Sequence, residues 1–504
     1  MTNSEQRFNS KEFKEVLGRY EAAQDKPDTA LFLDVDDILD IAEYYNSKGD
    51  MDAAERAADF AHHLYPHSPA VLALLARMAI FRYGDIAKAK QYARQIEEEG
   101  EEDLEYFYLK AEIMIAEDNI DEADRFLEAK MSLLDGDDLA DFLLDVPELF
   151  LDYRLPEMAA KWLARSDEKD SFDYKEIEGR IAFLNEDYKK SERIFKELLE
   201  DEPFSPSLWN TLATSQFMNG HVPESIESSE YAIAINPNDA EALVSKARGL
   251  AMVSRFTEAA DFYRRYLRQY PKDLYIRLLY SVVLIALNEY DKALHNLYYA
   301  LHHNVSDKGL TVDIVKEISY VLTQKGQYGD AMKLLEDSVE SGDIDHITHM
   351  IAEGRVLLAL GQLKQAADCF ADALINNRHA LFTYLEVATS YYEREMYEEA
   401  YKTLLAAFAH NPMERHGLAY LADCCRLTGR QGEYLKVLEL VCRTNPLEAK
   451  EVFASVFPKD VDPKDYYAYA LKQQGGDGSS PAPDNGSPTP DDGFPAPDNG
   501  QQAG

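Results

Sequence analysis

Several residue classes are scarce in this chain of 504 residues, and each scarcity removes a class of protein. Cysteine occurs only four times and never in a CxxC pair, which predicts reduced thiols rather than a disulfide framework. No apolar run approaches the roughly 18 residues of a membrane-spanning helix. The first ten residues are polar and do not form a secretory signal. We therefore expect a cytoplasmic protein with no membrane partner.

Basic residues are also few, with 52 Lys and Arg against 92 Asp and Glu, a net charge of −40. Nucleic acids and anionic membranes both need a basic face, so neither is an expected ligand. The imbalance is greatest at residues 97–157, which hold 22 acidic and 4 basic residues. This density is typical of a solvated convex face, and it also fits a landing surface for a basic protein segment.

A small residue recurs along the chain at one fixed spacing. The steps from Ala259 to Ala293 and from Ala366 to Ala400 are both 34 residues. A period of this length is typical of repeated helix–turn–helix units, which stack on their neighbours and present a long groove. The positions are Ala54, Ala123, Ala159, Ser191, Ser225, Ala259, Ala293, Ala331, Ala366 and Ala400.

The clearest unit, residues 206–239, has Trp209 and Ala213 on its first helix, Gly220 at the turn, Ser225 on its second helix and Pro237 after it. This pattern resembles the tetratricopeptide repeat. The resemblance covers about residues 35–448 and implies an all-α, right-handed superhelical solenoid of about twelve repeats. We expect the repeats to start near residues 35, 69, 104, 140, 172, 206, 240, 274, 312, 347, 381 and 415.

Some segments fit this register poorly, and others lie outside it. The fit is degenerate at 69–171, Pro147 falls inside a first helix, and residues 308–311 are predicted to break the register. Residues 1–34 are expected to form an N-terminal helical cap. Two helices at 449–474 are expected to cover the last repeat. The Gly-, Pro- and Asp-rich residues 475–504 are expected to be a disordered tail.

The resemblance further implies that the first helix of each repeat lines a concave groove, with known positions facing inward. Carried onto this sequence, the rule predicts an apolar ligand groove with arginines, formed by Arg180, Phe183, Asn210, Thr214, Phe217, Met218, Arg248, Met252, Leu278, Val282, Ile285 and Arg355. It also predicts an acidic groove formed by Asp36, Asp40, Glu43, Glu105, Glu112, Asp141, Asp145, Glu148 and Asp152.

The role of the groove arginines has two readings. Arg77, Arg180, Arg248 and Arg355 share one repeat position. Each can hold a carboxylate or an aromatic ring of a ligand, or can pair with a carboxylate of the chain itself. The apolar groove residues likewise either contact a ligand or pack beneath neighbouring helices.

Catalytic motifs are missing from the sequence. There is no GxxxxGK[ST], GxGxxG, GxSxG or HExxH pattern. Asp343, Asp345, His346 and His349 have a metal-like spacing, which a turn with a helix N-cap also explains. We therefore expect no enzyme and no cofactor. The leading hypothesis is a cytoplasmic scaffold that binds protein segments in its groove. The alternatives are an acidic chaperone or decoy for a basic client, and an enzyme with an unrecognised metal site.

Overall fold

The computed structural model describes residues 8, 10–24, 32–47, 50–99, 104–304, 307–377, 381–411, 413–458 and 461–474. Within these ranges the regular elements are helices, and none is a strand. None of the described helices is long and apolar enough to cross a membrane. The predicted tail at 475–504 lies outside the described residues. The chain divides into two compact units, Met1–Lys272 (unit 1) and Asp273–Gly504 (unit 2), and each is considered by itself.

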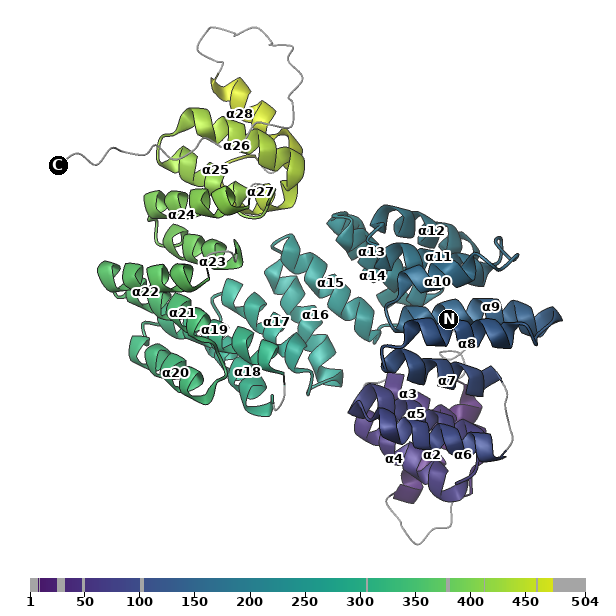
Figure 1. The fold of residues 1–504 in the computed structure, drawn as a ribbon. Coiled ribbons are helices and arrows are strands. Elements are labelled where there is room, and N and C mark those ends of the chain that lie inside the picture. The colour runs from purple at the N-terminus through teal and green to yellow at the C-terminus, as the bar shows by residue number, and fades with distance from the viewer. Residues whose placement is uncertain are drawn as a thin grey trace. The chain divides into compact units, whose positions relative to one another are not determined.

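The described residues of unit 1 form one leading helix and seven helical hairpins (Figure 1). The leading helix is α2 (Lys11–Gln24). The hairpins pair α3 (Val35–Ser47) with α4 (Met51–Leu64), α5 (Pro69–Tyr83) with α6 (Ile86–Glu99), α7 (Leu104–Ala116) with α8 (Ile120–Met131), α9 (Gly136–Asp152) with α10 (Pro156–Leu163), α11 (Phe172–Leu184) with α12 (Tyr188–Asp201), α13 (Pro206–Met218) with α14 (Val222–Ile235), and α15 (Ala240–Met252) with α16 (Phe256–Gln269).

Unit 2 contains five hairpins followed by short helices. The hairpins pair α17 (Leu274–Ala286) with α18 (Tyr290–His303), α19 (Lys308–Gln324) with α20 (Tyr328–Ser341), α21 (His346–Ala359) with α22 (Leu363–Asn376), α23 (Leu381–Tyr392) with α24 (Tyr397–His410), and α25 (Leu418–Leu427) with α26 (Gln431–Thr444). Three short elements follow, namely α27 (Pro446–Val452), the 3₁₀ helix η1 (Pro463–Asp465) and α28 (Tyr466–Gln474).

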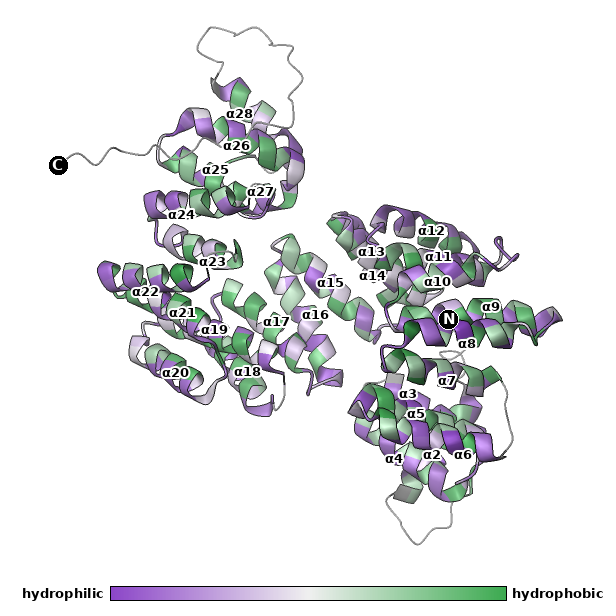
Figure 2. Ribbon diagram, viewed as in Figure 1, coloured by the Kyte–Doolittle hydropathy of each residue, from purple (hydrophilic) through white to green (hydrophobic). Residues whose placement is uncertain are grey.

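The small residues of the 34-residue period lie where paired helices cross. Ala259, Ala293 and Ala366 are completely buried, and Ser191 and Ser225 take the same place in their repeats. A larger side chain there would push the two backbones apart. Figure 2 shows apolar and polar residues both present on the individual helices, as packing on neighbouring hairpins requires. The prediction of an all-α repeat fold with about twelve repeats is confirmed, because the described residues contain twelve such hairpins.

Two repeat starts were predicted wrongly. We expected first helices from about 140 and 312, but α9 begins at Gly136 and α19 at Lys308, and each has 17 residues. Residues 308–311 therefore form an extra first turn of α19, and this insertion accounts for the predicted break in register, since Ala293 and Ala331 are 38 residues apart. Asp307 fixes this start, since its carboxylate accepts a hydrogen bond from the Leu310 backbone N–H at 3.0 Å. Pro147 lies inside α9, as predicted, and the helix continues through it.

The division into one solenoid with two caps stays a prediction. Helices do lie where the caps were expected, since α2 precedes the first hairpin and α27 and α28 follow the last. At the C-terminal end, the rings of Phe457 and Tyr466 stack with centres 4.1 Å apart, and both residues belong to the same core as Leu438 of α26.

Candidate protein-binding surfaces on the first helices

Some of the predicted groove residues of unit 1 form an accessible apolar surface. It lies on the neighbouring first helices α13 and α15. Met218 is 47% exposed and Met252 is 50% exposed. The Arg248 guanidinium carbon lies 5.2 Å from the centre of the Phe217 ring, within the range of a cation–π contact. No described carboxylate lies within ion-pair distance of Arg248. We call Phe217, Met218, Arg248 and Met252 the methionine surface.

Asn210, predicted to contact a ligand, is instead a structural residue. Only 4% of it is exposed. Its Nδ2 donates a hydrogen bond to Asp239 Oδ1 at 2.9 Å, and the same oxygen accepts from the Ala242 backbone N–H at the start of α15. Asn210 thereby ties α13 to the N-cap of the next first helix. Thr214, one turn further along, is half-buried and donates to the Asn210 carbonyl at 3.0 Å.

Two other predicted groove residues of unit 1 have partners within the unit. Arg180 forms ion pairs with Glu148 at 3.5 Å and with Asp152 at 3.4 Å. The Phe183 ring packs edge-on against Tyr188 of the paired helix α12, with centres 5.5 Å apart. Arg180 is therefore already supplied with carboxylates, in contrast to Arg248.

The predicted acidic residues on α7 and α9 come together in unit 1. Arg77 Nε donates to Glu112 Oε2 at 3.0 Å, and Arg77 also pairs with Glu105. The Tyr108 hydroxyl donates to Asp145 Oδ2 at 2.7 Å. Desolvation raises the pKa of Glu112, Asp145 and Glu148 above the ordinary value for such groups. The charged forms of these carboxylates are therefore disfavoured, because the nearby positive charges do not offset their desolvation.

The acidic residues on α3 do not behave as one set. Asp36 and Glu43 are exposed, as expected for a charged surface. Asp40 is buried and makes interactions inside unit 1, so its prediction as a groove residue was wrong. Among the described residues, the predicted acidic side chains that act on one another lie on α7 and α9.

In unit 2 the predicted groove residues are largely occupied by internal contacts. Leu278 is buried in a core cluster and was wrongly predicted to face a ligand, whereas Val282 is exposed and Ile285 is half-buried. Arg355 Nε donates to Ser390 Oγ at 2.7 Å. The cleft beside it has a volume of about 20 Å³, enough for about one water molecule and not for an organic ligand.

Comparison with known proteins bears on the two hairpins that carry the methionine surface. The tetratricopeptide repeat family model matches residues 210–273, which extend from α13 to just beyond α16. The match covers 64 of the 504 residues and identifies these two hairpins as tetratricopeptide repeats. No curated protein matches it. Tetratricopeptide repeats support a general role in protein interaction, and they are typically not enzymes.

Solved structures resemble the chain at low identity. A tetratricopeptide repeat protein from Parabacteroides merdae is 15% identical, with 52% of this chain and 99% of that chain covered and a TM-score of 0.44. The APC/C hetero-tetramer Cut9–Hcn1 is 13% identical, with 84% and 95% covered and a TM-score of 0.35. PilW, a type IV pilus biogenesis factor, is 18% identical, with 43% and 97% covered and a TM-score of 0.36.

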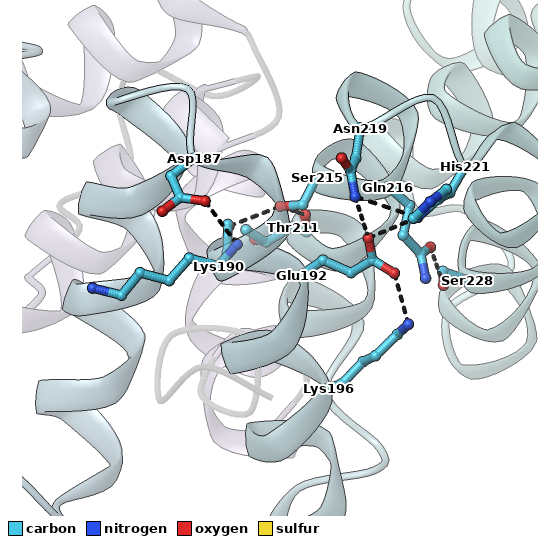
Figure 3. Close-up of polar contacts among 11 residues, drawn as sticks. Asp187, Lys190, Glu192, Lys196, Thr211, Ser215, Gln216, Asn219, His221 and Ser228 are labelled. Carbon is cyan, nitrogen blue, oxygen red and sulfur yellow. Dashed lines mark hydrogen bonds and ion pairs between the residues drawn. The ribbon is translucent and has the colours of Figure 1, made fainter. Parts of the chain in front are cut away.

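Sequence reasoning missed a polar network around the buried Glu192, between two neighbouring hairpins (Figure 3). Glu192 on α12 accepts hydrogen bonds from Lys196 Nζ at 2.6 Å and from Asn219 Nδ2 at 2.9 Å, and pairs with His221 Nδ1 at 2.9 Å. Burial acts to raise the pKa of Glu192, but these three partners outweigh it and lower the pKa. The network joins α12 to the turn between α13 and α14, so its role is structural.

The residues with a metal-like spacing in unit 2 make ordinary hydrogen bonds and ion pairs. Asp345 accepts from the Thr348 backbone N–H at 2.7 Å and so caps α21. His346 Nε2 lies 2.7 Å from Asp372 Oδ2. Across the ranges that the structure describes, no group of three or more His, Cys, Asp or Glu side chains is placed to hold a metal ion.

Proposed function

We propose that this protein is an interaction scaffold, and that the methionine surface of unit 1 binds protein segments. The observation that carries the proposal is Arg248. Of the four arginines at this repeat position, three have hydrogen-bonding or ionic partners within their own unit, namely Arg77, Arg180 and Arg355. Arg248 contacts only an aromatic ring among the described side chains.

The neighbours of Arg248 support a peptide ligand. Methionine side chains are flexible and polarizable, so Met218 and Met252 can repack around different apolar residues. The guanidinium can donate two parallel hydrogen bonds to a carboxylate while it stays over the Phe217 ring. We therefore infer a segment that carries an apolar side chain beside a carboxylate, in extended or helical form. The cytoplasmic location remains a proposal drawn from the sequence.

The test begins with a partner captured by the full-length chain. Arg248→Ala with Met252→Ala should weaken the partner about tenfold or more, equivalent to about 1.4 kcal/mol. Both side chains are exposed, so the melting temperature should change little. The matched control is Arg443→Ala with Met413→Ala, which removes the same two residue types from exposed places in unit 2. Equal affinity for the two double variants would refute the assignment.

The acidic-client hypothesis remains a separate candidate. It is favoured by the desolvated carboxylates on α7 and α9, which the methionine surface does not include. An aromatic pair beside those carboxylates makes the hypothesis specific enough to test.

A further inference from the structure

We propose a second binding surface in unit 1, centred on Phe81 and Tyr153, that binds basic amphipathic segments of another protein. It shares no residue with the methionine surface, so either proposal can fail alone. Its core is an aromatic pair. Phe81 on α5 is 59% exposed, and its ring centre lies 5.4 Å from that of Tyr153, which directly follows α9.

The aromatic pair spans three consecutive first helices. Helix α7 contacts both α5 and α9, and the two rings come from the helices on either side of it. Because Phe81 is this exposed, most of the surface of its side chain does not pack against the rest of the unit. The pair therefore provides an apolar contact that reaches across the first-helix face of unit 1.

The Tyr153 hydroxyl supplies a second observation. Its oxygen is buried, and among the described residues it has no hydrogen-bond partner. Burial raises the pKa of Tyr153, and the negative charges of Glu112 and Asp152 act in the same direction. Tyr153 therefore stays neutral beside two carboxylates, whose negative charge favours a cation nearby.

The charge around the pair defines the ligand. Six predicted acidic residues lie on α7 and α9 (Glu105, Glu112, Asp141, Asp145, Glu148 and Asp152), and Arg77 and Arg180 form ion pairs with four of them. The other basic side chains on this stretch are Lys110 of α7 and Arg154, which follows Tyr153, so acidic side chains still outnumber basic ones. Desolvation raises the pKa of Asp145, and the neighbouring Asp141 and Glu105 raise it further.

A basic amphipathic segment satisfies both the aromatic pair and the excess of carboxylates. Its arginine or lysine groups supply positive charge, and one of them can lie over the exposed face of Phe81. Its apolar side chains cover the remainder of the aromatic pair. Simple polycations offer only the charge, so they should bind weakly and without dependence on Phe81.

The experiment uses the full-length chain and a synthetic 18-residue helical peptide of leucine, lysine and arginine, labelled for fluorescence anisotropy. We expect Phe81→Ala to weaken binding about fivefold and Asp141→Asn with Asp152→Asn to weaken it about tenfold in low salt, because each removes part of the surface. Tyr153→Phe should leave both the binding and the melting temperature nearly unchanged, since it removes only a buried hydroxyl and keeps the ring.

Three controls decide the outcome. Phe382→Ala removes an aromatic ring that is 77% exposed in unit 2, and Glu336→Gln with Asp337→Asn removes two exposed charges there. Both should leave the affinity within twofold, as should Arg248→Ala on the methionine surface. If the control charges matter as much as Asp141 and Asp152, or if spermine binds as tightly as the peptide, the attraction is nonspecific and the proposal fails.

Discussion

Gly354 offers the sharpest test of how the repeats pack. It lies in the middle of α21, and a Cβ atom added there would be 2.4 Å from Phe370 Cε1 and 2.8 Å from both Cδ1 and Cζ. Normal carbon–carbon contacts are about 3.5–4.0 Å, so Gly354→Ala shortens a contact by about 1 Å. Phe370 is buried and its ring packs against Tyr391 at 5.0 Å, which leaves it little room to move.

The expected loss of stability can be estimated from two opposing effects. Overpacking a core costs about 1–3 kcal/mol. Alanine is about 1 kcal/mol better than glycine inside a helix, which offsets part of that cost. We therefore expect Gly354→Ala to lower the free energy of unfolding by up to about 2 kcal/mol. The urea midpoint of the full-length chain should fall, and hydrogen exchange should rise mainly in α21–α24, because repeats couple to their neighbours.

The matched control is Gly329→Ala in α20 of the same unit. A Cβ there would have no heavy atom within 4 Å, so only the helix preference changes and stability should stay equal or rise slightly. If Gly354→Ala were as stable as Gly329→Ala, the close approach of α21 and α22 would be wrong. If exchange rose equally throughout unit 2, the local coupling of the repeats would be wrong.

Three further predictions follow from particular contacts. Ala293→Leu places a large side chain at a completely buried helix crossing and should cost about 1–3 kcal/mol, measured by urea unfolding, and an unchanged midpoint would contradict the crossing. Glu192→Ala removes the acceptor for Lys196, Asn219 and His221 and should cost about 1–3 kcal/mol, with faster exchange where α12 meets α13. Backbone N–H groups of His416 and Arg415 lower the pKa of Glu414 from 4.5 to about 2, so its stabilising contribution is present above pH 4.5 and is lost as the pH falls towards 2. The melting temperature of Glu414→Gln should accordingly lie below that of the wild type at pH 7, with a difference that shrinks between pH 4.5 and 2, and a constant difference would contradict the shift.

The repeat pattern was readable in the sequence because helix crossings restrict residue size. Only a small side chain fits at the helix crossings that Ala259, Ala293 and Ala366 occupy. The 34-residue period is therefore kept even where other positions vary. The length of each first helix was less readable. It depends on the capping residue, and Asp307 begins α19 one turn earlier than the small-residue period suggests.

Turn positions show why glycine alone was an incomplete signal. Gly220 and Gly429 adopt left-handed backbone angles between paired helices, with φ values of 80° and 78°. Arg154, Ser254 and Asn288 adopt the same conformation at equivalent turns, with φ values of 57°, 60° and 59°. The packing of the two helices imposes the left-handed backbone angles of the turn, and a residue other than glycine then adopts them.

The candidate site was only partly predictable. The repeat position of a residue predicts the direction of its side chain, but it does not predict which residue that side chain contacts. Asn210 and Leu278 point towards the first-helix face, but the next hairpin covers them. A usable signal existed for the arginines. Arg77 precedes Glu112 by 35 residues, and Arg355 precedes Ser390 by 35, so contacts between neighbouring repeats follow the repeat length plus one. Searching for acceptors at that spacing would have found the partners of Arg77 and Arg355, but not those of Arg180, because Glu148 and Asp152 precede it in the chain.

Site-specific photo-crosslinking tests the central claim most directly. A photoreactive side chain would replace Met218, Met252 or the exposed control Met413 in the full-length chain, each in turn, in the presence of a captured partner. The proposed function predicts crosslinks to one short segment of the partner from positions 218 and 252, and none from position 413. Crosslinks from position 413 with none from 218 or 252 would show that the methionine surface is not where the protein binds its partner.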